Sequence, residues 1–436
     1  MAEIQAPRGT QDILPPLSER FGAHESLGAD IFERAGYRRI ITPMFEDTGL
    51  FVRGVGGSSD IVHKEMYTFT DRSENSLTLR PEGTSSVMRA VVTNHMWDAG
   101  LPIKLWYSAA MFRYDRPQKG RYRQHHQLGI EAIGSEDPAI DAEVIGVGQE
   151  MLERAGVTEF ELILNSIGHP GCRGDYMPKL RAFLQEHREE LDADCKRRME
   201  TNPLRVFDCK NERDQEILAG APTLQDDLCE ECRAHFAAVQ EYLGDMGIAF
   251  RIDPRLVRGL DYYTRTAFEF QTSLLDAAQS TICGGGRYDV LSEMIGGPPL
   301  AGVGFGSGIE RVLLAQEAAG KAAGPIAVDC FVIAVGSEQK RAAMMLARSF
   351  RRASLSADLP FSDKGLKAQL KHANRLGARY TCIIGADEAA EGVVTIRDME
   401  TGDQERVGLE KAPQWVASAL QDKHNDAAGR PRKETP

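Results

Sequence analysis

The chain has 436 residues, of which 64 are acidic and 52 basic, for a formal net charge of −12. Hydrophobic residues make up 42% and charged residues 27%, which is typical of a globular protein with more than one domain. The acidic balance argues against a protein that coats nucleic acid non-specifically, but it leaves room for a local basic surface.

Other sequence features bear on location and redox state. No apolar run approaches the roughly 18 residues that a membrane-spanning helix needs, so we expect no membrane association. The first residues lack a charged leader followed by an apolar stretch, so we expect a cytoplasmic protein. The eight cysteines are then expected to be reduced thiols rather than a disulfide scaffold.

The N-terminal part of the chain mixes helical and strand patterns. Apolar residues recur at helical spacing from Leu17 to Ile31, and Gly36 provides a stop. Strands are predicted in the three segments 38–46, 105–115 and 123–134.

Residues 165–253 differ from their surroundings. They are mostly helical in pattern, charged, and contain five of the eight cysteines, which predicts a helical insertion within a larger domain. Cys229 and Cys232 have the spacing of half a zinc site, but no second pair with that spacing follows. Structural zinc and plain buried thiols both remain open, and the metal ligands are unknown.

An Ala- and Gly-rich stretch, residues 315–328, predicts a linker. Beyond it, strand and helix patterns alternate over 329–420, which predicts a small α/β domain with a parallel or mixed sheet. Helices are expected near 338–354 and 364–376. The polar segment 421–436 has no apolar period, so we expect a disordered tail.

The strand within 123–134 carries polar side chains on one face. Successive side chains point to opposite faces of a strand, so one face is apolar and the other holds Arg123, His125, Gln127, Gly129 and Glu131. This polar row either faces solvent or forms the floor of a ligand site, with Gly129 leaving room for the ligand.

Basic residues gather between this strand and the one before it. The cluster consists of Arg113, Arg116, Lys119, Arg121 and Arg123. It is either a solvated hairpin tip or a contact for phosphate or nucleic acid.

Glycines mark two later segments. In 256–266 a Gly follows an Arg and precedes two Tyr, which indicates either backbone close to a ligand or a strand with a bulge at Gly259. In 302–311 alternating glycines lead into a helix expected to start near Ser307 and to carry Arg311.

The second domain carries a basic stripe. Lys367, Lys371 and Arg375 are four residues apart and share one face of a predicted helix. The stripe either faces solvent or contacts an RNA backbone.

Together these segments resemble the class II histidyl-tRNA synthetases over nearly the whole chain to about residue 420. Three segments are similar to the class II motifs 1, 2 and 3, namely 36–46, 112–131 and 304–311. Four more are similar to histidine-specific signatures, namely 8–12, 79–84, 256–269 and 284–289.

The resemblance implies an α+β catalytic domain with an antiparallel sheet over 1–325, the helical insertion 165–253 within it, and a C-terminal α/β anticodon-binding domain. It implies ATP-dependent ligation of L-histidine to its tRNA through a histidyl-adenylate, with release of pyrophosphate and AMP. ATP with Mg²⁺, L-histidine, histidine tRNA and a second copy of the chain in a homodimer are the implied partners.

The resemblance also implies roles for individual residues. Arg258 and Arg113 would be catalytic and hold the α-phosphate region. The L-histidine site would be formed by Glu82, Gly83, Thr84, Arg113, Gln127, Glu131, Arg258, Tyr262, Tyr263 and Tyr288. Within this set the ammonium would lie at Glu82, Thr84 and Gln127, and the imidazole at Glu131 and Tyr263. ATP would be held by Arg113, His125 and Arg311.

His125 departs from the family pattern, which often has Phe at this position. An imidazole stacks on adenine over less area, but we expect ATP binding to survive. Arg116 and Gln118 would contact the acceptor end of the tRNA. Lys367, Lys371 and Arg375 would contact phosphates from the anticodon domain.

Two other functions use the same fold. A regulatory paralogue binds histidine for the first enzyme of histidine biosynthesis without charging tRNA, and it typically lacks the C-terminal domain and much of the ATP site. An inactive synthetase could also serve as an RNA-binding regulator. This chain has both features that the regulatory paralogue lacks, namely a C-terminal domain over 329–420 and the site residues Glu82, Arg113, Arg258 and Arg311. We therefore expect the ligase.

Overall fold

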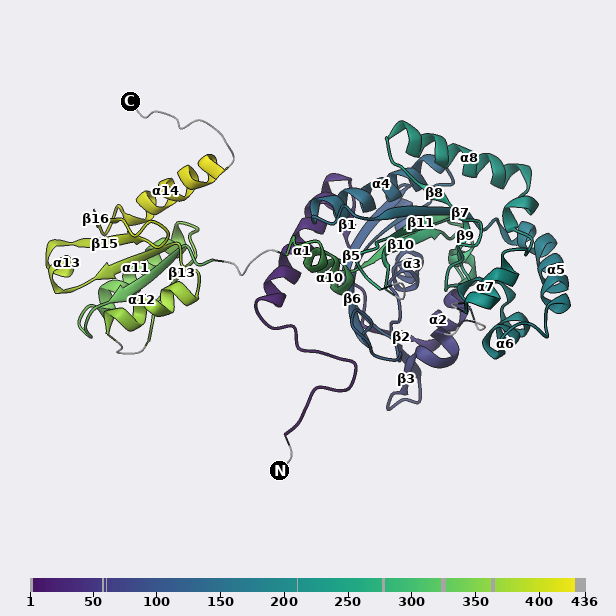
Figure 1. Cartoon of the computed structure of the whole chain (residues 1–436), viewed down its shortest axis with the longest axis horizontal. Coiled ribbons are helices and arrows are strands. Elements are labelled where there is room, and N and C mark those ends of the chain that lie inside the picture. Colours follow the sequence, from purple (N-terminus) through teal and green to yellow (C-terminus); the bar gives the residue numbers. More distant parts are fainter. Residues whose placement is uncertain are drawn as a thin grey trace. The chain divides into compact units, whose positions relative to one another are not determined.

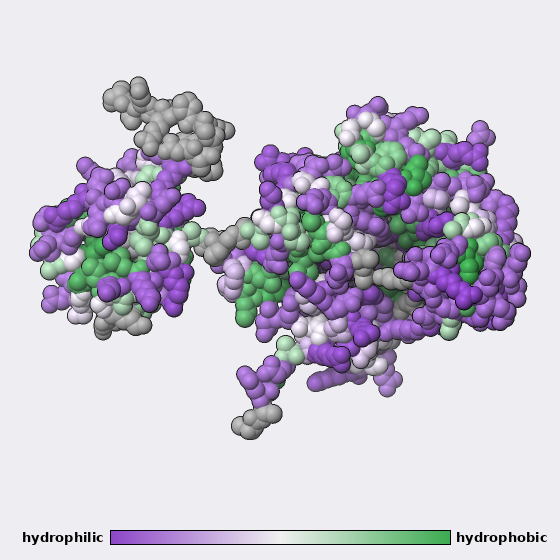
Figure 2. All heavy atoms as spheres, in the orientation of Figure 1, coloured by the Kyte–Doolittle hydropathy of each residue, from purple (hydrophilic) through white to green (hydrophobic). Residues whose placement is uncertain are grey.

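The computed structural model describes residues 3–427, apart from 57, 58, 60, 210, 277, 278, 323–326 and 362–364. The chain divides into two units, Met1–Ala323 and Gly324–Pro436, which are described separately. None of the described helices has the length and hydropathy that crossing a lipid bilayer requires. Figure 2 shows that hydrophilic residues cover much of the visible surface of both units.

An eight-stranded sheet forms the centre of the first unit, in the order β1-β5-β6-β11-β10-β9-β7-β8 (Figure 1). Its strands are β1 (Arg38–Arg39), β5 (Ile103–Phe112), β6 (Gln124–Ile133), β7 (Glu161–Ser166), β8 (Arg251–Ile252), β9 (Thr264–Gln271), β10 (Thr281–Arg287) and β11 (Gly302–Gly308). The pairings from β5 through β7 are antiparallel, and the edge strands β1 and β8 pair in parallel. The expected antiparallel sheet is confirmed, with parallel edges added.

Helices cover the apolar face of this sheet. They are α1 (Leu17–Arg34), α4 (Pro138–Arg154) and α10 (Ile309–Ala318). Phe32, Val144 and Phe305 pack there with Leu128 and Ile130 of β6. Fully burying one such side chain stabilises the fold by about 1.5–3 kcal/mol, so this layer anchors the sheet.

The opposite side of the sheet packs against α3 (Thr84–Thr93), α9 (Leu291–Met294) and part of the insertion. A small sheet in the order β2-β4-β3 and α2 (Thr48–Val55) complete this side. The small sheet consists of β2 (Phe45–Asp47), β3 (Tyr67–Thr70) and β4 (Ser76–Leu79). The strand predicted over 38–46 is therefore wrong as one element, because it splits into β1 and β2.

The insertion between β7 and β8 is helical, as predicted. Its α-helices are α5 (Pro170–Glu186), α6 (Ala193–Thr201), α7 (Glu212–Leu218) and α8 (Glu230–Asp245). Tyr176, Leu180 and Leu184 of α5 join the same apolar cluster as Val87 of α3 and Tyr107 of β5, so the insertion shares the core on this side.

The second unit contains a five-stranded mixed sheet in the order β13-β12-β14-β15-β16. Its strands are β12 (Cys330–Ala334), β13 (Ala357–Asp358), β14 (Tyr380–Ile384), β15 (Val393–Asp398) and β16 (Gln404–Gly408). Its helices are α11 (Lys340–Arg352), α12 (Leu366–Arg375), α13 (Ala386–Glu391) and α14 (Ala412–Ala427). α11 and α14 pack on one sheet face, and α12 on the other.

Three boundaries differ from the sequence predictions. α14 runs to Ala427, so the prediction of disorder from 421 is wrong for 421–427, and 428–436 lie outside the described residues. The linker predicted over 315–328 begins as the last turn of α10, and its residues 323–326 lie outside the described part. α10 starts at Ile309 rather than Ser307, because β11 continues to Gly308.

Candidate active site

A cavity of about 450 Å³ opens over the face of the large sheet that α1, α4 and α10 leave uncovered. One face of β6 packs in the hydrophobic core, and the other lines the cavity. Leu128 and Ile130 are fully buried in the core, whereas His125 and Gln127 line the cavity. The alternating side-chain directions of a strand therefore make the polar row of β6 the floor of a cavity rather than a solvated surface.

Glycines under the cavity make room for the protein's own side chains. A Cβ on Gly129 would lie 2.4 Å from the ring of Tyr107, and one on Gly83 would lie 2.5 Å from the same ring. A Cβ on Gly304 would lie 2.0 Å from Oε2 of Glu131. The interpretation that Gly129 leaves space for a ligand is thus wrong, because Tyr107 occupies that space.

One end of the cavity is acidic and lies at the start of α3. The Glu82 carboxylate accepts hydrogen bonds from the backbone N–H groups of Thr84 (2.6 Å) and Ser85 (2.9 Å). It also accepts one from the Tyr262 hydroxyl at 3.3 Å. The N-terminus of a helix favours a negative charge, so this carboxylate is held in one orientation with its charge supported.

Glu131 lies next to this site and is completely buried. Its carboxylate accepts hydrogen bonds from Thr84 Oγ1 (2.7 Å) and the Tyr288 hydroxyl (2.5 Å). Burial raises the pKa of Glu131 to about 8, although both hydrogen bonds favour its charged form. The rings of Tyr262 and Tyr263 are in contact close by, with centroids 4.7 Å apart and the ring planes tilted by 49°.

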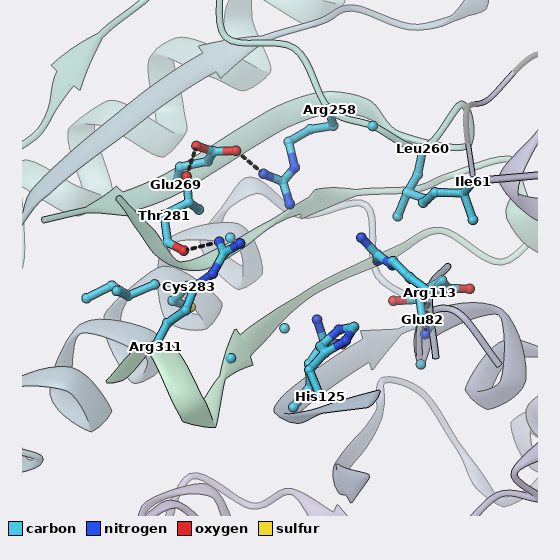
Figure 3. Close-up of a pocket in the computed structure, with 18 of the residues that line it drawn as sticks. Ile61, Glu82, Arg113, His125, Arg258, Leu260, Glu269, Thr281, Cys283 and Arg311 are labelled. Carbon is cyan, nitrogen blue, oxygen red and sulfur yellow. Dashed lines mark hydrogen bonds and ion pairs between the residues drawn. The ribbon is translucent and has the colours of Figure 1, made fainter. Parts of the chain in front are cut away.

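The other end of the cavity is basic. Arg113 follows β5, Arg258 comes from the loop before β9, and Arg311 comes from α10; Figure 3 shows the three guanidinium groups around one open space. Burial and then the charges of Arg121 and Arg113 lower the pKa of Arg311. The positive charges of these arginines are therefore held close together, with room for an anion between them.

Each guanidinium is positioned by the protein. Arg311 donates from Nε to the carbonyl of Gly120 (3.1 Å) and from Nη1 to that of Thr281 (2.8 Å). Nε of Arg113 donates to the carbonyl of Pro81 at 2.8 Å. Arg258 forms an ion pair with Glu269 and lies 5.5 Å from the ring centroid of Tyr263.

His125 lies near the basic residues (Figure 3). Burial, followed by the charges of Arg113 and Arg311, lowers the pKa of His125 to about 3. Its imidazole is therefore neutral at neutral pH, so a flat uncharged ring faces the cavity.

The structure brings most of the sequence-predicted substrate residues together. The cavity wall includes Glu82, Gly83, Thr84, Arg113, His125, Gln127, Arg258, Tyr262, Tyr263 and Arg311. Glu131 and Tyr288 lie behind this wall and reach it through the hydrogen bond from Thr84. Of the two interpretations of 256–266, the bulged strand at Gly259 is wrong, because 256–263 form a loop and β9 begins only at Thr264.

The predicted RNA contacts lie elsewhere. Arg116 and Gln118 belong to the loop between β5 and β6 and are not part of the cavity wall. Arg123 packs over the ring of Tyr114 at 3.8 Å. Lys367, Lys371 and Arg375 are exposed on α12 in the second unit.

Several cavity residues received no role from the sequence, among them Tyr107, Tyr122, Glu269 and Thr281. Tyr107 could have been found by extending the alternation of its strand, because it shares a face with Arg113. Glu269 closes a segment already singled out, but nothing local indicates that its carboxylate meets Arg258. Thr281 carries no signal at all.

Comparison with known proteins gives a consistent picture. Residues 9–312 match a family model described as histidyl-tRNA synthetase, and residues 329–419 match one described as an anticodon binding domain. The histidine–tRNA ligase of Halothermothrix orenii is 47% identical over 408 residues, covering 93% of this chain and 97% of that protein. The histidine–tRNA ligase of Moorella thermoacetica is 50% identical over 404 residues, covering 92% of this chain and 95% of that protein. The crystal structure of the apo histidyl-tRNA synthetase of S. aureus has a TM-score of 0.79 and 38% identity, covering 95% of this chain and 100% of that one.

Proposed function

The chain belongs to the histidyl-tRNA synthetase family, and we propose that its cavity joins the carboxylate of L-histidine to the α-phosphate of ATP. It is a class II aminoacyl-tRNA synthetase that ligates histidine to its tRNA. A regulatory role without tRNA charging is less well supported, because the full-length relatives are ligases and the C-terminal domain is matched as well.

The observation that carries the proposed chemistry is the convergence of three arginines and the buried carboxylate of Glu82 on one cavity, with Glu131 directly behind Thr84 of its wall. ATP and the histidine carboxylate are both anionic, so cations must bring them together. Arginine suits this task because its fork stays charged and binds oxyanions in a bidentate way.

At the acidic end, Glu82 accepts the ammonium of histidine together with Thr84 and Gln127. The imidazole lies between Glu131 and Tyr263, with Tyr262 and Tyr288 closing the pocket. A site that pairs both ring nitrogens rejects amino acids of similar size strongly, because its own buried polar groups would be left without partners.

At the basic end, Arg113 and Arg258 hold the α-phosphate while Arg311 holds the rest of the triphosphate, and His125 stacks on adenine. A carboxylate oxygen of histidine attacks the α-phosphorus, and pyrophosphate leaves. In the second step a tRNA ribose hydroxyl attacks the histidyl carbonyl, AMP leaves, and a phosphate oxygen of the adenylate takes the hydroxyl proton.

Mg²⁺ is expected to arrive with the nucleotide. It prefers oxygen ligands and is usually held by one or two carboxylates together with substrate phosphates. The cavity offers Glu269, which accepts a hydrogen bond from Thr281 at 2.7 Å and pairs with Arg258. An ion there would share this carboxylate with Arg258 and Thr281 and would neutralise phosphate charge.

The tRNA is proposed to make two separate contacts. Arg116 and Gln118, in the loop between β5 and β6, contact the acceptor end. Lys367, Lys371 and Arg375 of α12 contact phosphates near the anticodon. We expect the enzyme to work in the cytoplasm, because translation consumes its product there.

A homodimer formed through the segment 36–46 completes the proposal. Ile41 is 81% exposed and Met44 56% exposed, and exposed large apolar side chains grouped together favour a protein interface. Light scattering is expected to give the mass of two chains, and Ile41→Asp is expected to give one. A single-chain mass for the unchanged protein would contradict this.

The adenylation step is tested by histidine-dependent exchange of pyrophosphate into ATP. We expect Arg258→Ala to lower the exchange rate by about 10²–10³-fold, as expected for removing a group that stabilises developing charge. Full exchange by this variant would show that Arg258 has another role.

Arg116→Ala is the matched control, since it removes an arginine outside the cavity. It is expected to keep exchange and to slow only the charging of tRNA. Equal loss of both activities would contradict the proposed division between the cavity and the loop.

A further inference from the structure

Outside the catalytic cavity, four potential metal ligands converge at the base of the insertion. They are His169, Cys172, Cys229 and Cys232, whose ligand atoms all lie within 4.8 Å of one another. The sequence indicated only the second pair. The fold brings a His-x-x-Cys pair from 57 residues earlier against it, which supplies the missing half of a four-ligand site.

The two pairs occupy equivalent places on two helices. His169 and Cys229 are the N-cap residues of α5 and α8, and each accepts a hydrogen bond from the backbone N–H of the cysteine three residues later. Helix N-termini stabilise thiolates. Cys172 and Cys232 lie in the first turns and are 2% and 1% exposed, so water is largely excluded.

The four ligand atoms are close enough to surround one ion, but one pair is about 0.6 Å closer than tetrahedral Zn²⁺ would hold it and must widen when the ion binds. His169 Nδ1 lies 2.9 Å from Cys172 Sγ and 3.6 Å from Cys232 Sγ. Ligands of tetrahedral Zn²⁺ with bonds of about 2.0–2.3 Å lie about 3.5–3.8 Å apart. The backbone N–H groups of Cys229 and Cys232 donate to the sulfurs of Cys172 (3.3 Å) and Cys229 (3.4 Å), as outer-shell donors to metal-bound thiolates do.

We propose that His169, Cys172, Cys229 and Cys232 bind one structural Zn²⁺ that ties α5 to α8. Three sulfurs and one imidazole favour Zn²⁺ over Mg²⁺ or Ca²⁺, which prefer oxygen. Four protein ligands close the coordination sphere, so the ion is structural and does not take part in the ligase reaction.

The position of the ion gives it a mechanical role. α5 and α8 are the first and last helices of the insertion, so the ion joins the two ends of that segment. Arg265 of β9 connects the site to the large sheet. Its guanidinium forms an ion pair with Glu231 of α8, and its backbone N–H donates to the carbonyl of Gly168 at 2.8 Å. Tyr263 lies two residues before Arg265, and the ion therefore fixes the insertion beside the histidine pocket.

A second cluster in the insertion provides an internal control. Asp192, Cys195, Cys209 and Asp214 also lie within 4.8 Å of one another. This cluster offers two carboxylates and two thiols in place of one imidazole and three thiols, a harder donor set that suits Zn²⁺ less well. Asp192 accepts the N-cap hydrogen bond of Cys195 (2.7 Å), and Asp214 accepts from Cys209 Sγ (3.4 Å).

The test begins with the metal content of the full-length, tag-free protein after dialysis, measured by plasma mass spectrometry. We expect one zinc per chain. We also expect the Co²⁺-substituted protein to show the sulfur-to-cobalt charge-transfer band and the visible bands of a tetrahedral site. Absence of zinc, iron in its place, or a Cys229–Cys232 disulfide would overturn the proposal.

Variants locate the ion. Cys229→Ser is expected to lose the zinc, and Cys195→Ser to keep it; the reverse result would overturn the assignment. His169→Cys tests the site without removing a ligand, because it is expected to keep the ion and to strengthen the sulfur-to-cobalt band. An unchanged band in this variant would exclude His169 as a ligand. Circular dichroism checks that each variant is folded.

Discussion

At the acidic end of the cavity, the carboxylates of Glu82 and Glu131 already have hydrogen-bond donors from the protein. At the basic end, Arg113, Arg258 and Arg311 face one another, and the pKa of Arg311 is lowered by burial and by neighbouring arginines. The protein holds both ends in place, but the acidic end has its carboxylates satisfied by donors, whereas the basic end keeps like charges together that Glu269, paired with Arg258, offsets only in part. We therefore propose that the acidic end sets the specificity for histidine and that the basic end drives the binding of nucleotide.

Among substitutions that keep the size of the side chain, the largest expected effect is at the acidic end. Glu82→Gln removes the charge that pairs with the ammonium, and hydrogen bonds to charged groups contribute about 1.5–3 kcal/mol. We expect kcat/KM for histidine in pyrophosphate exchange to fall by about 100-fold, while the KM for ATP stays the same. Glu143→Gln, which changes a carboxylate paired with Lys104 outside the cavity, is expected to have no such effect.

Glu131 adds a pH dependence to the acidic end. Its folded-state pKa of about 8 lies above the ordinary value of 4.5, so between these pH values the folded protein keeps a proton that the unfolded chain has released. The free energy of unfolding of the unliganded protein therefore contains a contribution that falls as pH rises from 4.5 to 8. The equilibrium constant for unfolding rises by at most about tenfold per pH unit from this group.

Urea unfolding from pH 5 to pH 8 measures this contribution. Glu131→Gln cannot ionise, so its stability is expected to vary less with pH than that of the unchanged protein over this window. Parallel pH profiles for the two proteins would mean that Glu131 is already ionised in the fold.

At the basic end, Arg311→Lys keeps the charge but loses the planar fork that two carbonyls hold in place. We expect the KM for ATP to rise by about tenfold, a cost of about 1.4 kcal/mol, with the KM for histidine unchanged. Equal rises in both KM values would show that the two ends of the cavity are not independent.

The smallest effect is expected on α12, whose cations are exposed rather than buried. Replacing Lys367, Lys371 and Arg375 by Ala should weaken tRNA binding modestly. The slope of the logarithm of the binding constant against the logarithm of the salt concentration should become shallower by up to about 3. Pyrophosphate exchange should be unchanged. A loss of exchange would mean that the stripe has a structural role.

Patterns that depend on neighbouring residues were predictable. The helix from Leu17 and the polar face that holds Gln127 and Glu131 follow from periods of 3.6 and 2 residues. The position of Arg113 on the same face as Tyr107 follows from the same rule. The roles of Arg258 and Arg311 could be predicted only from the resemblance to a family. No local sequence pattern indicates that the loop before β9 and the helix after β11 lie close together in the fold.

The sequence by itself determined the periodic elements, the helical insertion and the residue types available for anion and histidine binding, because these depend on short-range geometry and composition. The tertiary structure decided that Tyr107 fills the space above Gly129, that Glu269 meets Arg258, and that His169 and Cys172 join Cys229 and Cys232. Each of these meetings joins residues distant in the chain, and their proximity results from the packing of helices and strands rather than from any local preference.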